Sequence, residues 1–385
     1  MKSAARTATI TTAVLDTDEA FAALRQEWDE LLHASANGCF FLSWQWLHTW
    51  WKHLAEDRRL HIITARCEGK LVAIAPLAIR PSRYLRLLPF PVLEFLGSGN
   101  VGSDYLGILV RKGYEDGAVR AIAALLTDHE QVLELSQVER TNPPVTALAL
   151  QLRQLGWRMH CTTTSFCPYI DFSDQTWDSY LAGLSSAHRA NFRRRYKKLQ
   201  ARFDVRLELV ESEHQRGEAL RILIDLHLRR WGSRGGSDAL HSEELVAFHE
   251  DFSKQALQQD QLRLYVLWLD NVAVAALYGF VVNGAFYFYQ SGFDMNYREH
   301  SVGLVIMGLV IQDAFDQGLR EFDFLHGEEA YKYLWAGAER ELVRFYFFPP
   351  HARGSLYSQF LRLRQRIKRQ LAQWAPRRKC ELDPP

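Results

Sequence analysis

Apolar positions along the chain follow two repeating patterns, and segments of the two kinds alternate. Apolar residues spaced three and four apart predict amphipathic helices. These helices are expected at residues 16–33, 115–127, 145–155, 177–184, 188–202, 220–231 and 243–258. Short apolar runs bounded by turn residues predict strands. These strands are expected at residues 8–15, 60–65, 71–79, 92–96, 131–135, 286–290, 321–325 and 341–348, with a hairpin at 262–279. The alternation predicts an α/β fold of the α+β kind, with mixed central sheets.

One stretch, residues 286–335, contains a complete βαβ unit. The aromatic strand Phe286–Gln290 leads through a loop into an apolar helix that begins near Ser301. The helix ends at Gly318, since glycine commonly stands just after a helix, and the strand at 321–325 follows. The first turn of such a helix presents backbone N–H groups that suit an anion. The stretch therefore predicts an anion site at the start of this helix.

The loop before this helix resembles the pyrophosphate loop of GNAT-type acyltransferases. The pattern is Arg298-x-x-Ser301-x-Gly303, where that family has Gln or Arg, two residues, Gly, one residue and then Gly or Ala. Ser301 occupies the position where the first glycine is usual. The resemblance implies that an acyl-CoA pyrophosphate is bound, with help from the helix dipole, by Arg298 and the backbone of Ser301, Val302, Gly303 and Leu304. The alternative interpretation is a tight βα turn with no ligand.

The segments around this loop resemble the CelD/BcsL family of GNAT-fold acyltransferases, which is related to the Fem-type peptidoglycan aminoacyltransferases. The resemblance rests on LSSAHRANFRRRYKKL upstream, on the helix that contains His227, and on FDFLHGEEAYKYLW downstream. It covers residues 165–345 well and the N-terminal half loosely. It implies acyl transfer from an acyl-CoA in bacterial exopolysaccharide or cell-envelope biosynthesis.

Two predicted hairpins, at 60–77 and 262–279, share the order strand, turn and return strand. The similarity indicates an internal duplication, although any two hairpins share part of this pattern. Residues 111–115 lack a glycine turn entering their helix, so we expect the first copy to have lost the cofactor site. Together with the family resemblance, the duplication predicts two tandem GNAT-like modules and a basic tail, at residues 1–160, 161–350 and 351–385.

Acyl transfer from a thioester needs one group that takes a proton from the nucleophile and another that protonates the leaving thiolate. In GNAT folds the thioester lies where two central strands diverge, and the resemblance assigns the strands at 286–290 and 321–325 to that place. The candidates near it are Asp294, His326, Glu328 and His227 as bases, and Tyr331 as proton donor. The alternative is a turn cap or salt bridge for each carboxylate and a packing role for His227.

The predicted helix at 188–202 is strongly basic, with seven Lys or Arg among its fifteen residues. Three interpretations stay open: a solvated face, a site for an anionic substrate or the coenzyme A phosphates, and a surface for tRNA or other nucleic acid. Under the second interpretation the substrate-binding residues are Arg189, Arg193 and Lys197. Lys332, in the family-like pattern Gly-Glu-x-x-Tyr-Lys, is a further candidate for binding an anionic acceptor.

Composition narrows the class of protein. The net charge of +1 over 385 residues gives no overall attraction to nucleic acid, so nucleic acid is not the expected partner. The five cysteines are scattered without the spacing of a zinc site, which suits a reducing cytosol and predicts no metal. The N-terminal residues lack the apolar segment of a signal peptide. No Ser-His-Asp pattern or Walker loop supports a hydrolase or a kinase. We therefore expect a soluble cytoplasmic protein.

Two further segments have open interpretations. Residues 39–54 contain six Phe and Trp side chains, which we expect to be core rather than the lining of an acyl or sugar pocket. Residues 355–379 form a predicted basic amphipathic helix. This helix can dock on its own domain, which we favour, or contact the inner membrane surface.

The sequence thus predicts an acyltransferase that moves an acyl group, expected to be acetyl, to an amine or hydroxyl of a saccharide or cell-envelope precursor. Acetyl-CoA or another acyl-CoA is the expected co-substrate, and no metal is expected. One alternative is a Fem-like transferase that uses aminoacyl-tRNA. The other is a non-catalytic GNAT-fold partner of a polysaccharide synthase at the membrane.

Overall fold

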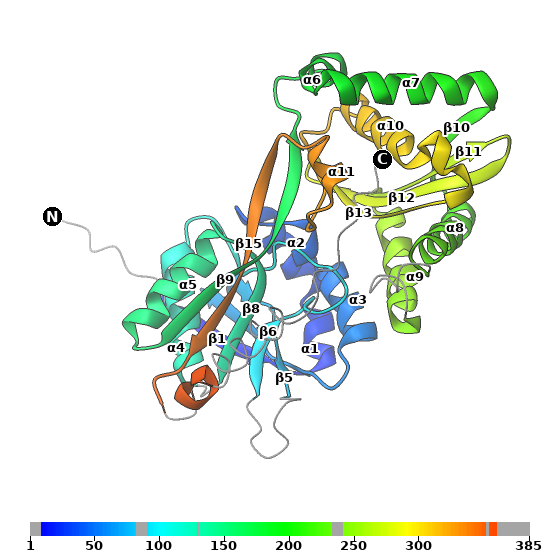
Figure 1. Cartoon of the computed structure of the whole chain (residues 1–385). Helices are drawn as coiled ribbons and strands as arrows, with labels where there is room; N and C mark the ends of the chain where they lie inside the picture. Colours follow the sequence, from blue (N-terminus) through cyan, green and yellow to red (C-terminus); the bar gives the residue numbers. More distant parts are fainter. Residues whose placement is uncertain (1–8, 82–90, 129–130, 233–241, 352–353, 360–385) are drawn as a thin grey trace. The chain divides into compact units, whose positions relative to one another are not determined.

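The computed structural model describes residues 9–81, 91–128, 131–232, 242–351 and 354–359. The chain divides into two compact units, each of which is described by itself (Figure 1). Unit 1 consists of Met1–Gly99, Ser103–Thr164 and Leu342–Asp383, and unit 2 of Asn100–Gly102, Ser165–Glu341 and Pro384–Pro385. Most of the predicted tail helix at 355–379 lies outside the described residues.

Unit 1 contains strands of two sheets together with helices. Its strands are β1 (Ile10–Leu15), β2 (Arg59–Leu60), β3 (Ile62–Cys67), β4 (Lys70–Ala75), β5 (Leu77–Arg80), β6 (Val92–Phe95), β7 (Leu109–Val110), β8 (Val132–Glu139), the first part of β9 (Arg158–Asp171) and the last part of β15 (Ala338–Phe348). Its helices are α1 (Asp18–Ala23), α2 (Arg25–Ala34), the 3₁₀ helix η1 (Phe40–Leu42), α3 (Trp44–Leu54), α4 (Glu115–Asp128) and α5 (Pro143–Gln154). One sheet has the order β1-β3-β4-β7, and the other contains β2-β5-β6-β8-β15.

The aromatic segment at 39–54 belongs to the core of unit 1. Phe41, Trp46 and Trp50 are each at most 1% exposed. The indole of Trp46 donates to the hydroxyl of Ser103 at 2.9 Å, which satisfies its polar N–H in the interior. The interpretation of this cluster as core rather than as a pocket is therefore confirmed.

The prediction of one continuous helix at 16–33 is wrong, because the helix breaks at Leu24. There the N–H of Leu24 donates to the carbonyl of Phe21 at 3.3 Å, a three-residue spacing that tightens the chain and ends α1. Phe21 in α1 and Trp28 in α2 are both fully buried. The break therefore leaves each of the two short helices with an apolar side chain in the core.

Unit 2 is built on one mixed sheet. Its strands are the last part of β9, β10 (Val205–Leu209), β11 (Leu262–Leu269), β12 (Val272–Val282), β13 (Ala285–Phe293), β14 (Glu321–Asp323) and the first part of β15. Its helices are α6 (Trp177–Gly183), α7 (Ser186–Arg202), α8 (Glu213–Gly232), α9 (Glu243–Gln258), the 3₁₀ helix η2 (Met295–His300), α10 (Val302–Asp316) and α11 (Ala330–Tyr333). The strand order is β10-β11-β12-β13-β14-β9, in which β13 and β14 are parallel.

Helices lie on both faces of this sheet (Figure 1). On one face α7 packs on α10, and the ring of Phe192 fills the space beside Gly308, where a Cβ would lie 2.2 Å from Phe192 Cε2. On the other face α8 approaches β13 at Gly292, where a Cβ would lie 2.7 Å from the backbone nitrogen of His227. The absence of a side chain at these two glycines therefore allows both helices to pack closely.

The two units repeat one arrangement of strands. In unit 2, β13 is followed by α10 and then by β14, which is parallel to β13 and antiparallel to β9. In unit 1, β6 is followed by β7 of the other sheet, by α4 and then by β8, which is parallel to β6 and antiparallel to β15. Each case is a helical crossover between parallel neighbours, preceded by hairpin strands. The predicted α/β fold with two modules on mixed sheets is therefore confirmed.

Candidate active site

The two parallel strands of unit 2 separate after a short pairing. β13 and β14 pair from Ala285↔Glu321 to Tyr287↔Asp323. Beyond Tyr287, β13 continues to Phe293 and pairs with β12 on its other edge. The chain after Asp323 stays alongside β9, with which β14 already pairs, since the N–H of Phe324 donates to the carbonyl of Pro168 at 2.9 Å. Beyond Tyr287 and Asp323 the two strands are thus no longer paired with each other, while each keeps its other neighbour.

The predicted pyrophosphate loop forms the start of α10. Ser301 has a left-handed backbone with φ of 54°, a conformation that favours glycine, and its N–H donates to the carbonyl of Arg298 at 2.9 Å. The next N–H groups, of Val302, Gly303 and Leu304, make no hydrogen bond with any residue that the structure describes. The first turn of α10 also contains no acidic residue. Because N–H groups and the helix dipole point the same way here, this turn suits an anion.

The corresponding helix of unit 1 has a different first turn. α4 begins with Glu115 and Asp116. The carboxylate of Glu115 accepts a hydrogen bond from the N–H of Gly113 at 2.8 Å. Carboxylates at a helix N-terminus stabilise the helix but repel a bound phosphate. The first turn of α10 therefore suits a pyrophosphate better than that of α4.

Three of the predicted catalytic residues follow β13 or β14. Asp294 begins η2, and its carboxylate accepts a hydrogen bond from the N–H of Asn296 at 2.8 Å. That bond is the turn cap that was the alternative interpretation of this side chain. His326 and Glu328 are exposed in the loop after β14.

The other two candidates lie on helices. His227 on α8 is 1% exposed, and its Nδ1 lies 3.4 Å from the carbonyl oxygen of Ser291 on β13. Tyr331 on α11 is half-buried and packs against the apolar core of the unit. Of the predicted bases, His227 is thus the least accessible to a substrate.

The predicted substrate-binding residues are separated by the structure. Arg193 and Lys197 are exposed on α7, whereas Phe192 and Leu199 on the same helix are buried. Arg189 donates to the main-chain carbonyls at the end of α6, at 2.7 Å for Ala182 and 3.1 Å for Leu184. It therefore joins α6 to α7.

Lys332 is buried, contrary to what a substrate-binding lysine on a surface would show. Its Nζ donates to the carbonyl of His326 at 2.8 Å and lies 3.0 Å from the carboxylate of Glu329. Both partners belong to the loop after β14, so Lys332 is engaged within that loop.

Two features of the site escaped the sequence analysis. Arg195 on α7 donates to the carbonyl of Glu299 at 2.8 Å and so links α7 to η2, just before the anion site. Its position three residues after the buried Phe192 is the signal that would have distinguished it from the exposed basic residues.

The second missed feature is a buried polar chain on the α9 face of the sheet. The hydroxyls of Tyr278 and Tyr289 lie 3.4 and 3.2 Å from Nδ1 and Nε2 of His249. Burial lowers the pKa of His249 to about 3 and raises the pKa of Tyr278 well above its ordinary value. The hydroxyl of Tyr289 also donates to the carbonyl of Val101. Alternation in the strand FYFYQ is the signal that separates Tyr289 from the core residues Phe286 and Phe288.

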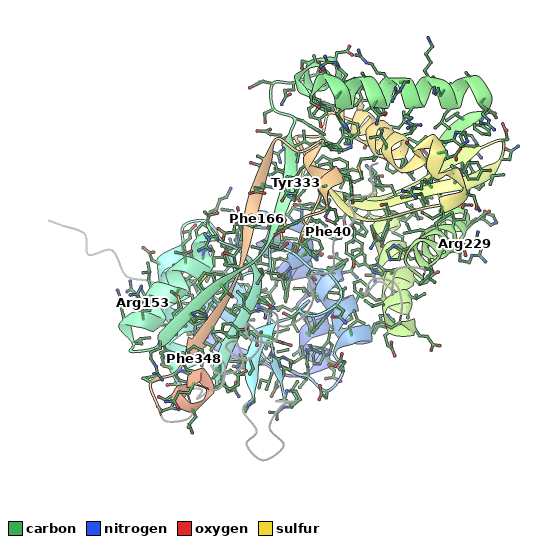
Figure 2. The ribbon with its side chains drawn as sticks, in the orientation of Figure 1. Phe40, Arg153, Phe166, Arg229, Tyr333 and Phe348 are labelled. Carbon is green, nitrogen blue, oxygen red and sulfur yellow. The ribbon has the colours of Figure 1, made fainter. Side chains whose placement is uncertain are left out.

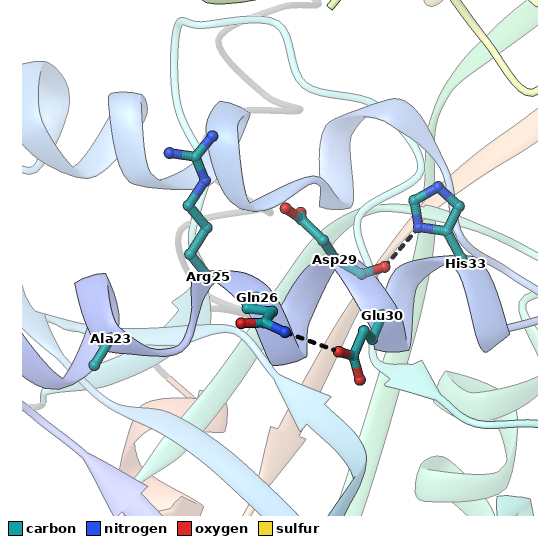
Figure 3. A pocket seen from close by; sticks show the side chains of 6 residues that line it. All are labelled: Ala23, Arg25, Gln26, Asp29, Glu30 and His33. Atoms are coloured by element: carbon teal, nitrogen blue, oxygen red, sulfur yellow. Dashed lines mark hydrogen bonds between the residues drawn. The ribbon is translucent and has the colours of Figure 1, made fainter.

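A pocket in unit 1 does not combine an anion-binding helix end with exposed acid–base residues, as the site at α10 does (Figure 3). It lies along the mostly exposed polar face of α2 and is lined by Ala23, Arg25, Gln26, Asp29, Glu30 and His33. Desolvation raises the pKa of Asp29 in this pocket. The hydrogen bonds of Gln26 to Glu30 and of His33 to the carbonyl of Asp29 both lie within α2. Among the described residues, no three metal-ligating side chains come together, and no helix is long and apolar enough to span a membrane.

Comparison with known protein families identifies the segment around α10. Residues 186–333 match the family model of the acetyltransferase (GNAT) domain. This segment is similar to a GNAT acetyltransferase domain, and we refer to it as the GNAT domain. The GNAT domain begins with α7 and ends with α11, so it includes β13, α10 and β14. It implies an acyl-CoA co-substrate and an acceptor for the acyl group.

Solved structures share the fold of the GNAT domain and of the rest of the chain. FemX has a TM-score of 0.62 at 12% identity, over 87% of this chain and 98% of FemX. The C-terminal domain of a putative lysylphosphatidylglycerol synthetase from Agrobacterium fabrum has a TM-score of 0.53 at 10% identity, over 88% of this chain and 95% of that domain. L-PGS from Bacillus licheniformis has a TM-score of 0.52 at 12% identity, over 88% and 95% of the two chains. At these identities the likeness shows the fold. No curated protein matches the sequence at a significant level.

Proposed function

We propose that this protein transfers an acyl group, expected to be acetyl, from acetyl-CoA to an amine or hydroxyl of a saccharide or cell-envelope precursor. The observation that carries the proposal is the arrangement of β13, β14 and α10 in the GNAT domain. The end of β13 that has left β14 is the end that leads into α10. One extended acyl-CoA would thus have its pyrophosphate at α10 and its thioester between the strands.

In this proposal the pyrophosphate accepts hydrogen bonds from the backbone N–H groups of Val302, Gly303 and Leu304. Arg298, exposed on η2, adds a positive charge beside them. Ser301 supplies the left-handed turn that starts the helix. Its own N–H does not bind the pyrophosphate, because it already donates to the carbonyl of Arg298. Arg195 supports the turn from α7 by holding the carbonyl of Glu299.

The chemical step forms a bond from the acceptor nitrogen or oxygen to the thioester carbonyl carbon and breaks the carbon–sulfur bond. We assign removal of the nucleophile's proton to His326, because its imidazole is exposed at the end of β14. Asp294 is a weaker candidate since it caps η2, and His227 since it is 1% exposed. Tyr331 is the proposed donor of a proton to the coenzyme A thiolate.

The exposed basic residues of α7 are proposed to attract an anionic acceptor rather than the coenzyme. Arg193 and Lys197 lie on the exposed side of α7, whereas its buried Phe192 packs on α10. An envelope precursor that carries phosphate groups would suit that surface. We place the protein in the cytoplasm, with the basic segment 355–379 as a possible peripheral membrane contact.

A Fem-like transfer of an aminoacyl group from tRNA is the second candidate. It is favoured by the likeness to FemX over 87% of the chain and by the basic surface of α7. In that case α7 would bind RNA phosphates, and the turn at α10 would not bind coenzyme A.

Acyl transfer with radiolabelled donors distinguishes the two functions. With [¹⁴C]acetyl-CoA and a panel of amino sugars and nucleotide-linked sugars, we expect label to move to a saccharide. His326→Ala should slow this transfer by roughly 100-fold or more, the usual effect of losing a general base. Transfer from charged tRNA alone, abolished by ribonuclease, would contradict the acetyl-CoA proposal and establish the Fem-like one.

A further inference from the structure

The loop after β14 contains one residue more than its partner strand accommodates. The N–H of Phe324 donates to the carbonyl of Pro168 at 2.9 Å, and the N–H of Gly327 donates to the carbonyl of Phe166 at 3.3 Å. From Phe324 to Gly327 the loop advances by three residues, while β9 advances by two, from Pro168 to Phe166. The extra residue in the loop makes this a β-bulge. Bulges of this kind redirect side chains and are common beside active sites. Figure 2 labels Phe166, which receives the second of these bonds.

The bulge is held in an unfavourable backbone conformation. Leu325 has φ of 56° and a buried side chain, although left-handed backbone is disfavoured for a bulky residue. Such a conformation persists when surrounding contacts fix it. One contact is with Asp323, which is fully buried and accepts a hydrogen bond from the N–H of Leu325 at 2.8 Å. The other oxygen of Asp323 lies 3.2 Å from the guanidinium of Arg340.

Lys332 fixes the opposite side of the same bulge. Its ammonium donates to the carbonyl of His326 at 2.8 Å and to that of Leu325 at 3.4 Å, and it pairs with Glu329 at 3.0 Å. Gly327 leaves room for this arrangement, because a Cβ there would lie 2.8 Å from Lys332 Nζ and 2.2 Å from Glu329 Oε2. Asp323 thus binds the N–H of Leu325, and Lys332 binds the carbonyls of Leu325 and His326.

The imidazole of His326 lies near Gly102, which is also close to Tyr289 of β13. A Cβ at Gly102, in the short segment that belongs to unit 2, would lie 3.6 Å from His326 Cε1 and 3.8 Å from the hydroxyl oxygen of Tyr289. Tyr289 lies on β13 two residues beyond the last pair with β14. The imidazole and the Tyr289 hydroxyl therefore both lie beside Gly102, and Tyr289 belongs to the stretch of β13 that has left β14.

We propose that Lys332 and Asp323 are positioning residues, which hold the strained bulge so that His326 faces the opening between β13 and β14. Lys332 is then part of the catalytic framework and does not bind the acceptor. The proposal rests on the proposed function in one respect, that His326 acts on the acyl group of a bound acyl-CoA.

Bromoacetyl-CoA tests this placement without knowledge of the acceptor. An imidazole nitrogen near the thioester displaces bromide from the reagent and forms a stable carbon–nitrogen bond, which mass spectrometry locates. In the native protein we expect saturable alkylation of His326. In Lys332→Met the maximal rate should fall at least tenfold, while the reagent concentration for half-maximal rate and the acetyl-CoA affinity measured by calorimetry stay within twofold of native.

Matched variants and hydrogen exchange complete the experiment. Lys254→Met changes an exposed lysine of α9 and should alkylate like the native protein. Amide exchange in the segment 322–336 should accelerate in Lys332→Met while the rest of unit 2 stays protected, which also shows that the variant is folded. Gly327→Ala, whose Cβ displaces Lys332 Nζ, should reproduce both effects if Lys332→Met does not fold.

The outcomes separate the two claims. Native alkylation of another residue, or unchanged alkylation and exchange in Lys332→Met, would overturn the positioning role even if acetyl-CoA binds. Absence of acetyl-CoA binding to the native protein would refute the proposed function instead. In that case hydrogen exchange still decides whether Lys332 holds the bulge.

Discussion

His249 is an ionisable side chain in the interior of unit 2, with 1% of its surface exposed. Burial lowers its pKa from the ordinary 6.5 to about 3, so the imidazole of the folded protein is neutral at pH 7. Between these two values the unfolded chain binds a proton that the folded chain does not. The contribution of His249 to stability is therefore complete above pH 6.5 and is lost as the pH falls toward 3.

Lowering the pH from about 7 to about 5 should reduce the free energy of unfolding by about 2 kcal/mol through His249. His249→Gln removes the titrating group, so its free energy of unfolding should fall by about that much less over the same interval. Urea denaturation at the two pH values measures the difference. His214→Gln, which changes an exposed histidine of α8, should keep the native pH dependence. Equal pH dependence in the native protein and His249→Gln would contradict a neutral buried imidazole.

Single residues were predictable where their partners are close in sequence. The cap formed by Asp294 involves a residue two positions away, and it was one of the two interpretations that the sequence left open. The burial of Lys332 was not visible, because a motif that presents a lysine does not show that its partners are main-chain carbonyls. The chain from Tyr278 through His249 to Tyr289 joins three elements and needed the fold.

At the scale of elements, the contact between α7 and α10 depends on one glycine. A Cβ at Gly308 would lie 2.2 Å from the ring of Phe192, which is 4% exposed. Gly308→Ala should therefore lower the free energy of unfolding by about 1–3 kcal/mol, the usual cost of overpacking a core. Urea denaturation measures this change.

Gly217→Ala is the matched control, because Gly217 also lies in a helix but a Cβ there meets no atom within 4 Å. This variant should be as stable as the native protein or more stable by up to about 1 kcal/mol, since alanine favours a helix. If Gly308→Ala were as stable as Gly217→Ala, the close packing of α7 on α10 would be wrong.

Element bounds followed from the sequence where the hydrophobic pattern is complete. α9 spans Glu243–Gln258, the predicted range, because its apolar stripe and its N-cap Ser242 coincide. α8 begins seven residues before the predicted residue 220, because its first turns are polar and carry no apolar period. β14 ends at Asp323 rather than Leu325, because the bulge interrupts regular pairing.

At the scale of the whole molecule, both units contain the same arrangement of strands and a crossover helix. The first turns of the two crossover helices, α4 and α10, differ in charge. The duplication was predictable from two similar hairpins. The course of the chain was not: it enters unit 2 within β9 and leaves it within β15. Long strands of this kind are set by pairing between residues far apart in sequence, which a local pattern does not contain. The acidic first turn of α4 and the uncharged first turn of α10 lead us to expect one acyl-CoA site per chain.

Titration of the protein with acetyl-CoA by isothermal calorimetry tests the central claim most directly. We predict saturable binding at one site per chain. Gly303→Glu should abolish it, because a carboxylate at the first turn of α10 repels phosphate. Space is also limited, since a Cβ at this position would lie 3.2 Å from the ring of Phe293. Gly217→Glu adds the same charge where there is open space and should bind like the native protein. No binding to the native protein, or binding that survives Gly303→Glu, would contradict the account.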